Sequence, residues 1–322
     1  MSRTIAGIVA FYPDPARVLR LIASIADDVS RIVLFANSPL EAAIKNGLST
    51  AAAQTSVTLI APGENVGLGS AYNRIVELAR LEGAEFVLLF DQDSTPSEGM
   101  VRRLEHLADE LKSRGEKPAV VGPRPTKANG EPFKVPRRRS SAEGLPGLAV
   151  DFAISSGSLI ALRATAEVGP FNEEFFIDAI DIEWCEGLER RRSVLGVDIP
   201  MTHRLGRGVI HLPLGLRLTD QPSERLYTYF RNQVAMLRLP HVPSAWKLRF
   251  IASLPARCLI YALRNGFARP AVSAIIFGLI DGIAHRLGPP PAAGRQSRPL
   301  SSKLSDSHPN SPFFARRCAI SP

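Results

Sequence analysis

Residues 86–94 read Phe-Val-Leu-Leu-Phe-Asp-Gln-Asp-Ser, five apolar residues followed at once by two carboxylates that stand two positions apart. Unbroken apolar runs of this length are typical of strands buried on both faces of a sheet. A tight turn after the run would let Asp91 and Asp93 approach one point. Hard oxygen ligands suit Mg²⁺ or Mn²⁺, which usually bridge to phosphate groups. The alternative is an Asx turn before the helix expected from Glu98.

Similar apolar runs alternate with segments of helical periodicity along the first 122 residues. Strands are expected at 4–11, 31–36, 57–60, 86–90 and 119–122, and helices at 16–25, 68–81 and 98–111. This alternation predicts an α/β fold, a Rossmann-like, mostly parallel sheet with helices on both faces. Ligands of such sheets collect at the carboxyl ends of the strands. Tyr12, Asn37 and Asp91 follow three of these strands, so we expect them around one crevice.

Residues 65–73, Asn-Val-Gly-Leu-Gly-Ser-Ala-Tyr-Asn, form a glycine-containing stretch that leads into a helix. The stretch lacks the Gly-Lys-Ser/Thr ending of a phosphate loop, and it lacks the third glycine of the dinucleotide fingerprint. We interpret it as a place where the backbone approaches a ligand closely.

Residues 175–185 carry three carboxylates within six positions, Asp178, Asp181 and Glu183, interleaved with apolar residues. Apolar neighbours desolvate a carboxylate and raise its pKa, as a general base requires. An ordinary amphipathic helix whose first turn is acidic explains the pattern equally well. Both interpretations stay open on this segment alone.

Two later segments offer a metal ligand and a phosphate ligand. His203 lies 22 residues after Asp181 and could complete a metal site with Asp93, with His211 as a competing candidate. A lone histidine is more commonly a surface or core residue. Residues 225–232 are basic and aromatic, and arginine side chains suit phosphate groups. A helix with its aromatic side chains in the core is nearly as good an explanation.

Charge and cysteine content bound the partners and the compartment. The net charge is +8, and residues 240–288 contain six lysines and arginines against one acid, Asp281. This balance suits anionic partners, but the excess lies away from the acidic motifs, so we expect no nucleic acid. Three widely spaced cysteines support neither a disulfide framework nor a zinc site, and we expect a cytoplasmic protein.

The C-terminal third divides by composition. Residues 1–235 are expected to form the α/β domain, 236–288 a basic amphipathic helical extension, and 289–322 a disordered tail rich in Pro, Ser and Arg. Its longest apolar run, 271–280, is too short to span a bilayer. The extension could lie peripherally on the inner face of the cell membrane, or it could be a helical pair packed on the catalytic domain.

In their order and spacing, these motifs resemble the family 2 glycosyltransferases, which have the GT-A fold. The forms Asp-Gln-Asp-Ser at 91–94 and Phe-Ile-Asp-x-x-Asp-Ile-Glu-Trp-Cys at 176–185 resemble the bacterial dTDP-rhamnose-dependent rhamnosyltransferases in particular. Further matches are Ser-Gly-Ser at 156–158, His-x-Leu-Gly at 203–206 and the basic aromatic segment at 225–232. The resemblance covers about residues 4–235.

The resemblance implies an inverting enzyme of surface-polysaccharide synthesis that transfers a sugar from a nucleoside diphosphate, dTDP-L-rhamnose, to a saccharide or lipid-linked acceptor. Another donor, such as a UDP-hexose or a galactofuranose nucleotide, and a non-catalytic sugar-nucleotide binder are the alternatives. The residue roles that it implies are then as follows: Asp181 as catalytic base, Asp93, Asp91 and His203 as ligands of Mg²⁺ or Mn²⁺, and Tyr12, Asn37, Asn65, Gly67, Asn73, Asp91, Arg225 and Arg231 around the nucleotide.

Two positions depart from the family pattern. The second strand of the family usually ends in Asp-Asn, whereas this chain has Ala36-Asn37. The family commonly has Leu-Arg-Ala after Trp-Cys, whereas this chain has Glu186-Gly187-Leu188, and an arginine among 190–192 could take over the missing role.

Overall fold

The structure is a computed structural model that describes residues 3–51, 56–126, 130–132, 146–188, 192–202, 208–211 and 217–291. Residues 1–290 form one unit by their internal contacts, and the elements below all belong to it. The expected tail lies outside the described residues from position 292 onward.

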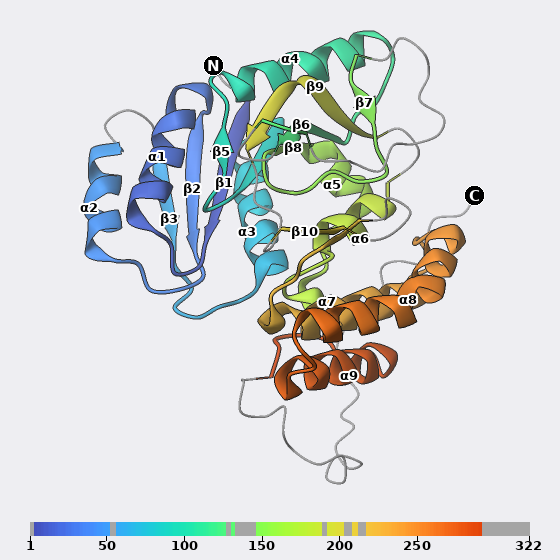
Figure 1. The fold of residues 1–322 in the computed structure, drawn as a ribbon. Helices are drawn as coiled ribbons and strands as arrows, with labels where there is room; N and C mark the ends of the chain where they lie inside the picture. The colour runs from blue at the N-terminus through green and yellow to red at the C-terminus, as the bar shows by residue number, and fades with distance from the viewer. Residues whose placement is uncertain are drawn as a thin grey trace. The chain divides into compact units, whose positions relative to one another are not determined.

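A nine-stranded sheet, counted over these described residues, has the order β3-β2-β1-β4-β8-β6-β9-β5, with β7 paired to β9 (Figure 1). Its strands are β1 (Thr4–Ala10), β2 (Arg31–Ala36), β3 (Val57–Ile60), β4 (Phe86–Asp91), β5 (Thr95–Pro96), β6 (Val120–Thr126), β7 (Leu148–Ala149), β8 (Ser158–Ala161) and β9 (Ser193–Thr202). β10 (Val209–His211) and β11 (Arg217–Thr219) form a separate ribbon.

The sheet is parallel on one side and mixed on the other. β1 pairs in parallel with β2 and β4, and β2 pairs in parallel with β3. β8 then runs antiparallel to both β4 and β6, while β6 and β9 are parallel. β1 and β4 are buried along nearly their whole length, because helices cover both faces of the sheet there. The expected α/β fold is confirmed, and the antiparallel β8 refines the expected mostly parallel sheet.

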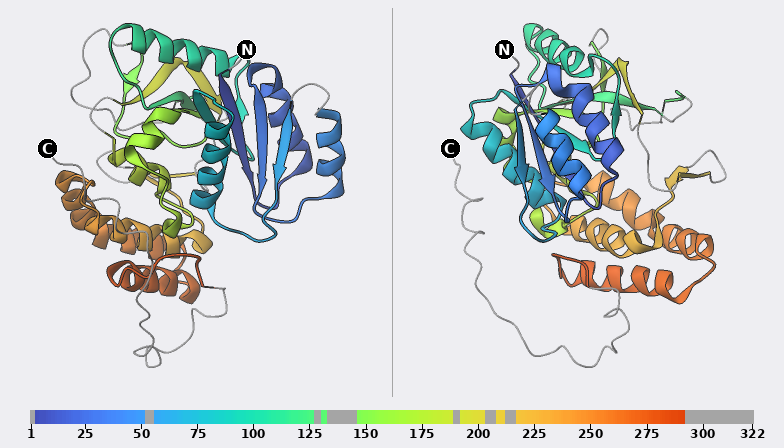
Figure 2. Two further views of the ribbon diagram at one scale, coloured as in Figure 1. Left: turned by 180° about the vertical axis from the view of Figure 1, so that it is seen from behind. Right: turned by 90° about the vertical axis from the view of Figure 1, so that its left-hand side faces the viewer.

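Helices lie on both faces of this sheet (Figure 2). α1 (Pro15–Ile25), α2 (Ala42–Ala51) and α4 (Met100–Ser113) lie on one face, and α3 (Leu68–Leu81) and α5 (Leu162–Val168) lie on the other. Each long helix buries one apolar stripe in the same core. α4, for example, buries Val101, Leu104, Ala108 and Leu111 at helical spacing. α6 (Ile180–Glu186) is short and follows a 3-10 turn at Glu173–Phe175.

Three C-terminal helices form a second cluster: α7 (Ser223–Ala235), α8 (Ser244–Arg264) and α9 (Arg269–Ile283). Small residues let α9 approach α7 closely. A Cβ on Gly278 would lie 2.6 Å from the Tyr227 carbonyl oxygen, and one on Gly282 would lie 2.6 Å from that of Arg231. α7 thus packs against the helices after residue 236, and the expected boundary at 235/236 falls inside one hydrophobic cluster.

Candidate active site

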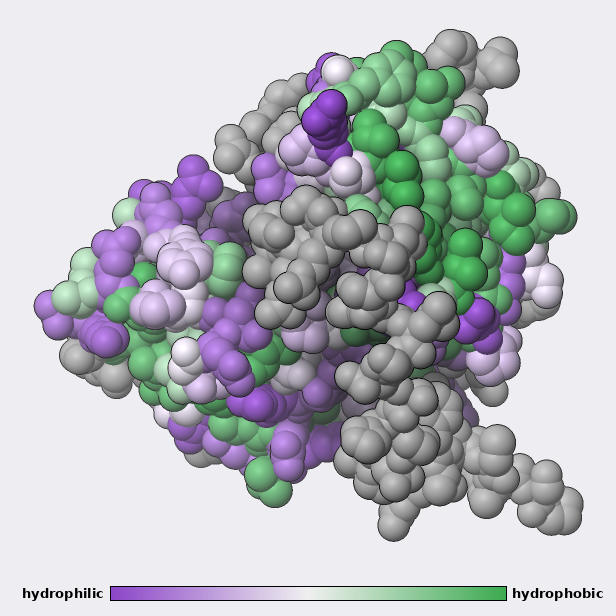
Figure 3. Space-filling model, turned by 90° about the horizontal axis from the view of Figure 1, so that it is seen from below, coloured by the Kyte–Doolittle hydropathy of each residue, from purple (hydrophilic) through white to green (hydrophobic). Residues whose placement is uncertain are grey.

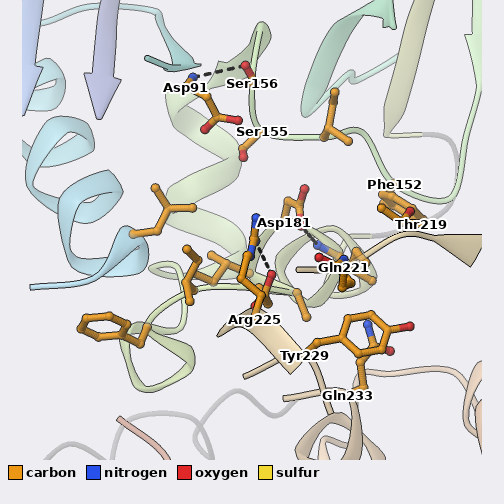
Figure 4. A pocket seen from close by; sticks show the side chains of 18 of the residues that line it. Asp91, Phe152, Ser155, Ser156, Asp181, Thr219, Gln221, Arg225, Tyr229 and Gln233 are labelled. Atoms are coloured by element: carbon orange, nitrogen blue, oxygen red, sulfur yellow. Dashed lines mark hydrogen bonds and ion pairs between the residues drawn. The ribbon is translucent and has the colours of Figure 1, made fainter. Parts of the chain in front are cut away.

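A pocket of about 1170 Å³ opens at the carboxyl ends of β1, β2 and β4 and reaches α7 and α8. The expected site residues that line it are Asn37, Asn65, Gly67, Asp91, Asp93, Asp181 and Arg225. Figure 4 shows Asp91, Asp181 and Arg225 in succession from the sheet toward α7. Residues that are far apart in the sequence, such as Asn37 and Arg225, therefore meet in one cavity. His203 lies outside the described residues.

The turn after β4 is held by hydrogen bonds to two other loops. The Asp91 backbone N–H donates to Ser156 Oγ at 3.2 Å, and the Ser94 and Ser156 hydroxyls are hydrogen-bonded. Gln92 pairs with the backbone of Phe11: its Oε1 accepts from the Phe11 N–H at 2.6 Å, and its Nε2 donates to the Phe11 carbonyl at 3.1 Å. The glutamine between the two aspartates therefore fixes the turn, which leaves both carboxylates free for the pocket.

Asp91 sits in an environment that disfavours its charge. Burial and, to a smaller extent, the neighbouring Asp93 carboxylate raise the pKa of its carboxyl to about 6, although the Arg225 guanidinium opposes both effects. Burial also raises the pKa of Tyr72, as does the charge of Asp91, and the Tyr72 hydroxyl is hydrogen-bonded to Ser155 Oγ at 2.9 Å. A bound cation would reduce the repulsion between the two carboxylates.

The carboxylates present fit a divalent metal in part. Asp91 and Asp93 supply oxygen ligands of the kind that Mg²⁺ and Mn²⁺ prefer. Across the described part of the chain, no group of three or more His, Cys, Asp or Glu side chains is positioned to hold a metal ion. A complete coordination shell would therefore need ligands beyond these two carboxylates.

Asp181 lies in the first turn of α6, after an unusual backbone path. Phe176, Asp178 and Ala179 all have positive φ values, 63°, 70° and 62°. Such conformations cost free energy in residues with a Cβ and persist only where the surroundings enforce them. Burial raises the pKa of Asp181, backbone hydrogen bonds such as that from the Ile182 N–H oppose the shift, and the charge of Asp91 adds to it.

α7 enforces this path through hydrogen bonds to main-chain carbonyls. Asn232 Nδ2 donates to the carbonyls of Phe175, Ile177 and Asp178 at 2.9, 2.6 and 3.0 Å. The Arg231 side chain, 1% exposed, donates to the carbonyls of Phe175 and Gly288. Burial lowers the pKa of Arg231. The Arg231 side chain therefore contacts main-chain carbonyls of the protein itself. It does not line the pocket in which we expected it to contact the nucleotide.

The Asp178 carboxylate completes the link between α7 and this segment. It forms an ion pair with Arg225 and accepts from Thr228 Oγ1 at 2.6 Å. Arg225 also lines the pocket, and none of the described residues accepts a hydrogen bond from its buried Nε. Arg225 therefore connects the wall of the pocket to Asp178.

The glycine-containing stretch packs against the same segment. Asn37 bridges to it through Nδ2, which donates to the Gly67 carbonyl, and through Oδ1, which accepts from the Val66 N–H, both at 3.2 Å. Gly67 has φ +84°, and a Cβ there would lie 2.9 Å from the carbonyl oxygen of Phe176. The close backbone approach expected at Gly67 is therefore made to Phe176 of the protein itself.

Two further expected nucleotide residues do not line the pocket. Tyr12 is 71% exposed, and its backbone N–H donates to Ser38 Oγ at 2.6 Å. Asn73 holds the loop before α6, because its side chain donates to the Phe171 carbonyl at 3.0 Å and accepts from the Phe171 N–H at 2.9 Å. Asn73 thus positions the loop that leads to Asp181 and does not itself face the pocket.

The far wall of the pocket was missed by the sequence analysis. Trp246 and Phe250 of α8 stack with ring centroids 5.4 Å apart. Arg257, about two helical turns after Phe250, donates to the Tyr229 hydroxyl. The spacing Trp246, Phe250, Arg257 marks one face of a helix, and that periodicity could have placed these residues together. The sequence of α8 alone does not show that this face lines the pocket, because that depends on how α7 packs beside it.

The departures from the family pattern can also be located. Ala36 is 3% exposed inside β2 and does not line the pocket, whereas the following residue, Asn37, does. Glu186 lines the pocket. Arg192 donates to Glu167 and to the Lys117 carbonyl, so it does not supply the arginine expected after Trp184-Cys185.

The chain is similar to known proteins in sequence and in fold. No family model matches the chain. A curated relative, "dTDP-rhamnosyl transferase RfbF" of Shigella flexneri, is 26% identical over 293 residues, which cover 88% of this chain and 96% of the relative.

Solved structures show the same fold at low sequence identity. TarS of S. aureus, residues 1–349, in complex with UDP-GlcNAc, superposes with a TM-score of 0.56 at 16% identity over 89% of this chain and 82% of that one. The mannosyltransferase PcManGT of Pyrobaculum calidifontis, in complex with GDP-Man and Mn²⁺, gives 0.51 at 13% over 88% and 86%. The chain is therefore similar in sequence to a rhamnosyltransferase, and it shares the GT-A fold of these glycosyltransferases.

Proposed function

We propose that this glycosyltransferase moves L-rhamnose from dTDP-L-rhamnose to a saccharide or lipid-linked acceptor, with inversion at the anomeric carbon, in the cytoplasm. The observation that carries the proposal is the meeting of Asp91, Asp93 and Asp181 in one pocket with Arg225. The relative from Shigella flexneri, named as a dTDP-rhamnosyl transferase, supports the choice of donor.

Asp181 is the proposed catalytic base. Its carboxylate removes the proton of an acceptor hydroxyl, and the resulting oxygen attacks the anomeric carbon from the face opposite the nucleoside diphosphate. Burial raises the pKa of Asp181, which strengthens the carboxylate as a proton acceptor. Arg225, which lines the pocket, is proposed to donate to a phosphate oxygen of the donor.

Asp93 and Asp91 are the proposed ligands of Mg²⁺ or Mn²⁺, with His203 as a third. The bound cation would neutralise charge on the departing diphosphate. Asp91 and Asp93 carry mutually repelling charges beside the pocket, which supports this assignment. Asn37, Asn65 and Gly67 form the wall against which the nucleotide is proposed to lie.

Replacement of Asp181 by Asn tests the mechanism. General-base catalysis typically contributes about 10²–10⁴ in rate, so we expect kcat for rhamnosyl transfer to fall by at least a hundredfold with the donor affinity retained. Asp198→Asn is a matched control, because Asp198 is exposed on β9 outside the pocket. Unchanged turnover in a folded Asp181→Asn protein would refute the assignment of the base.

The donor is tested by thermal stabilisation with dTDP-, UDP- and GDP-sugars in the presence of Mn²⁺. Because ligands that bind only the folded state raise its stability, dTDP-L-rhamnose should give the largest increase in Tm. Stabilisation by a UDP-sugar alone would replace the rhamnosyl assignment with a hexosyl or galactofuranosyl one. Stabilisation without any transfer or hydrolysis would favour a non-catalytic binder.

A further inference from the structure

One face of α8 packs against the rest of the protein, and the other face is exposed. Its inner face carries Trp246, Phe250, Arg257 and Tyr261 at intervals of four and seven residues, and this face contacts the pocket or the α7–α9 cluster. Its outer face is apolar. It consists of Leu248, Ile251, Pro255, Leu259 and Leu263, which follow one another every three or four residues.

This outer face is exposed although it is apolar. Leu248 is 69% exposed, and Ile251, Leu259 and Leu263 are between 51% and 55% exposed. Figure 3 looks onto this group of helices from below and shows hydrophobic surface gathered on one side. Single exposed leucines are ordinary, but a continuous row along one helix marks an interaction surface.

The charges of α8 indicate what covers this face. The helix has four basic residues, Lys247, Arg249, Arg257 and Arg264, and no acidic one. By helical geometry, Lys247 and Arg249 lie on the two sides of the apolar row. Lys247 is half-buried and its Nζ donates to the Leu239 carbonyl, whereas Arg249 is exposed at the rim of the pocket. A helix with an apolar face, basic flanks and modest overall hydropathy binds in the plane of an anionic membrane surface. Two copies of this face would bring like charges together, which disfavours self-association.

No helix in the described part of the chain is long and apolar enough to cross a bilayer. We propose that α8 docks on an anionic lipid bilayer through the apolar row Leu248, Ile251, Leu259 and Leu263. The inner face of the same helix lines the pocket, so docking would bring the pocket wall close to the lipid headgroups. The inference goes beyond the proposed function, because binding to a lipid bilayer does not depend on transfer of the sugar.

Sedimentation of the full chain with vesicles tests the proposal. We expect the protein to bind vesicles of equal parts phosphatidylglycerol and phosphatidylcholine at least tenfold more tightly than pure phosphatidylcholine, and to bind more weakly at high salt. The double variant Leu259→Gln, Leu263→Gln should bind the anionic vesicles at least tenfold more weakly, because it removes two apolar side chains from the row.

Leu81→Gln is the matched control, because Leu81 is 82% exposed at the end of α3, away from α8 in the sequence. This variant should bind vesicles as tightly as the original chain does. The Asp181→Asn protein should also bind normally, which separates docking from catalysis. Three results would each overturn the proposal: no binding of the original chain to anionic vesicles, equal binding of the double variant, or a dimer in light scattering that only the double variant dissociates.

Discussion

Asp91 and Asp181 line the same pocket, but different kinds of contact hold them. Asp91 ends a buried strand, and its turn is fixed by Gln92, Ser94 and Ser156, polar partners in loops at the sheet edge. Asp181 follows a backbone with three positive φ values, and α7 holds that backbone from more than 50 residues away in the sequence. One carboxylate therefore depends on the sheet, and the other depends on a helix that must dock correctly.

This difference predicts how each half of the pocket responds to substitution. In the sheet half, the carboxylates themselves carry few structural contacts, so their loss should affect chemistry and spare stability. In the half built on α6 and α7, the side chains that position Asp181 are also core contacts, so stability and activity should change together. Function is separable from folding on one side of the pocket and coupled to it on the other.

The largest expected effect is on the sheet side. Asp93 is an exposed residue that lines the pocket. Asp93→Asn should lower metal-dependent turnover by at least a hundredfold, because it removes a charged ligand of the proposed cation. The thermal midpoint without metal should stay within about 1 °C, in line with an exposed side chain. Kinetics at varied Mn²⁺, paired with calorimetry, measures both quantities, and a lowered Tm would break the proposed separation.

The corresponding experiment on the helix side is Asn232→Leu. Asn232 is fully buried and satisfies three carbonyls of the segment before Asp181. Leaving buried acceptors unpaired costs about 1–3 kcal/mol each in isolation, and relaxation should reduce the total to about 3 kcal/mol. We expect a lower free energy of unfolding together with a loss of kcat.

Thr228→Val is a milder comparison on the same helix, because it removes one hydrogen bond to Asp178 and keeps the shape of the side chain. It should cost about 1 kcal/mol and lower kcat less than Asn232→Leu does. If Asn232→Leu lost stability but kept full activity, the segment would not depend on α7 for its active geometry.

The same contrast explains what the sequence could predict. The strands 31–36 and 57–60 and the helix 68–81 are found at the expected bounds, because apolar runs and helical periodicity are local signals. Asp91 and Asp93 were placed by the strand before them. The antiparallel β8 could not be foreseen, because an apolar run does not reveal strand direction.

The roles of the α7 residues were hidden for a similar reason. Arg231 and Asn232 suggest a phosphate site by composition, but their partners are carbonyls 54–57 residues away. A hydrogen bond to a main-chain carbonyl requires no particular residue at the accepting position. The sequence therefore carries no local sign of it, and only the docked helix reveals whether a polar residue serves the ligand or the fold.

The last effect concerns pH, and it has the opposite sign to the others because the substitution is expected to stabilise the protein. The pKa of Asp91 is about 6 in the folded protein, against an ordinary value of 3.8. The folded state therefore holds a proton between these values that the unfolded chain releases. The stabilisation from this protonated carboxyl is complete below pH ~4 and is lost as the pH rises through about 6.

Asp91→Asn should remove that loss, because the amide stays neutral. In the presence of a chelator, the variant should be more stable than the original chain by about 2 kcal/mol at pH ~7.5, and the difference should vanish near pH ~4. Urea unfolding at the two pH values measures it. Added Mn²⁺ should stabilise the original chain and narrow the gap, since a cation relieves the repulsion between Asp91 and Asp93. A variant less stable than the original chain at pH ~7.5 would mean that the Asp91 carboxylate supports the fold, and the sheet half would then couple function to folding as the α7 half does.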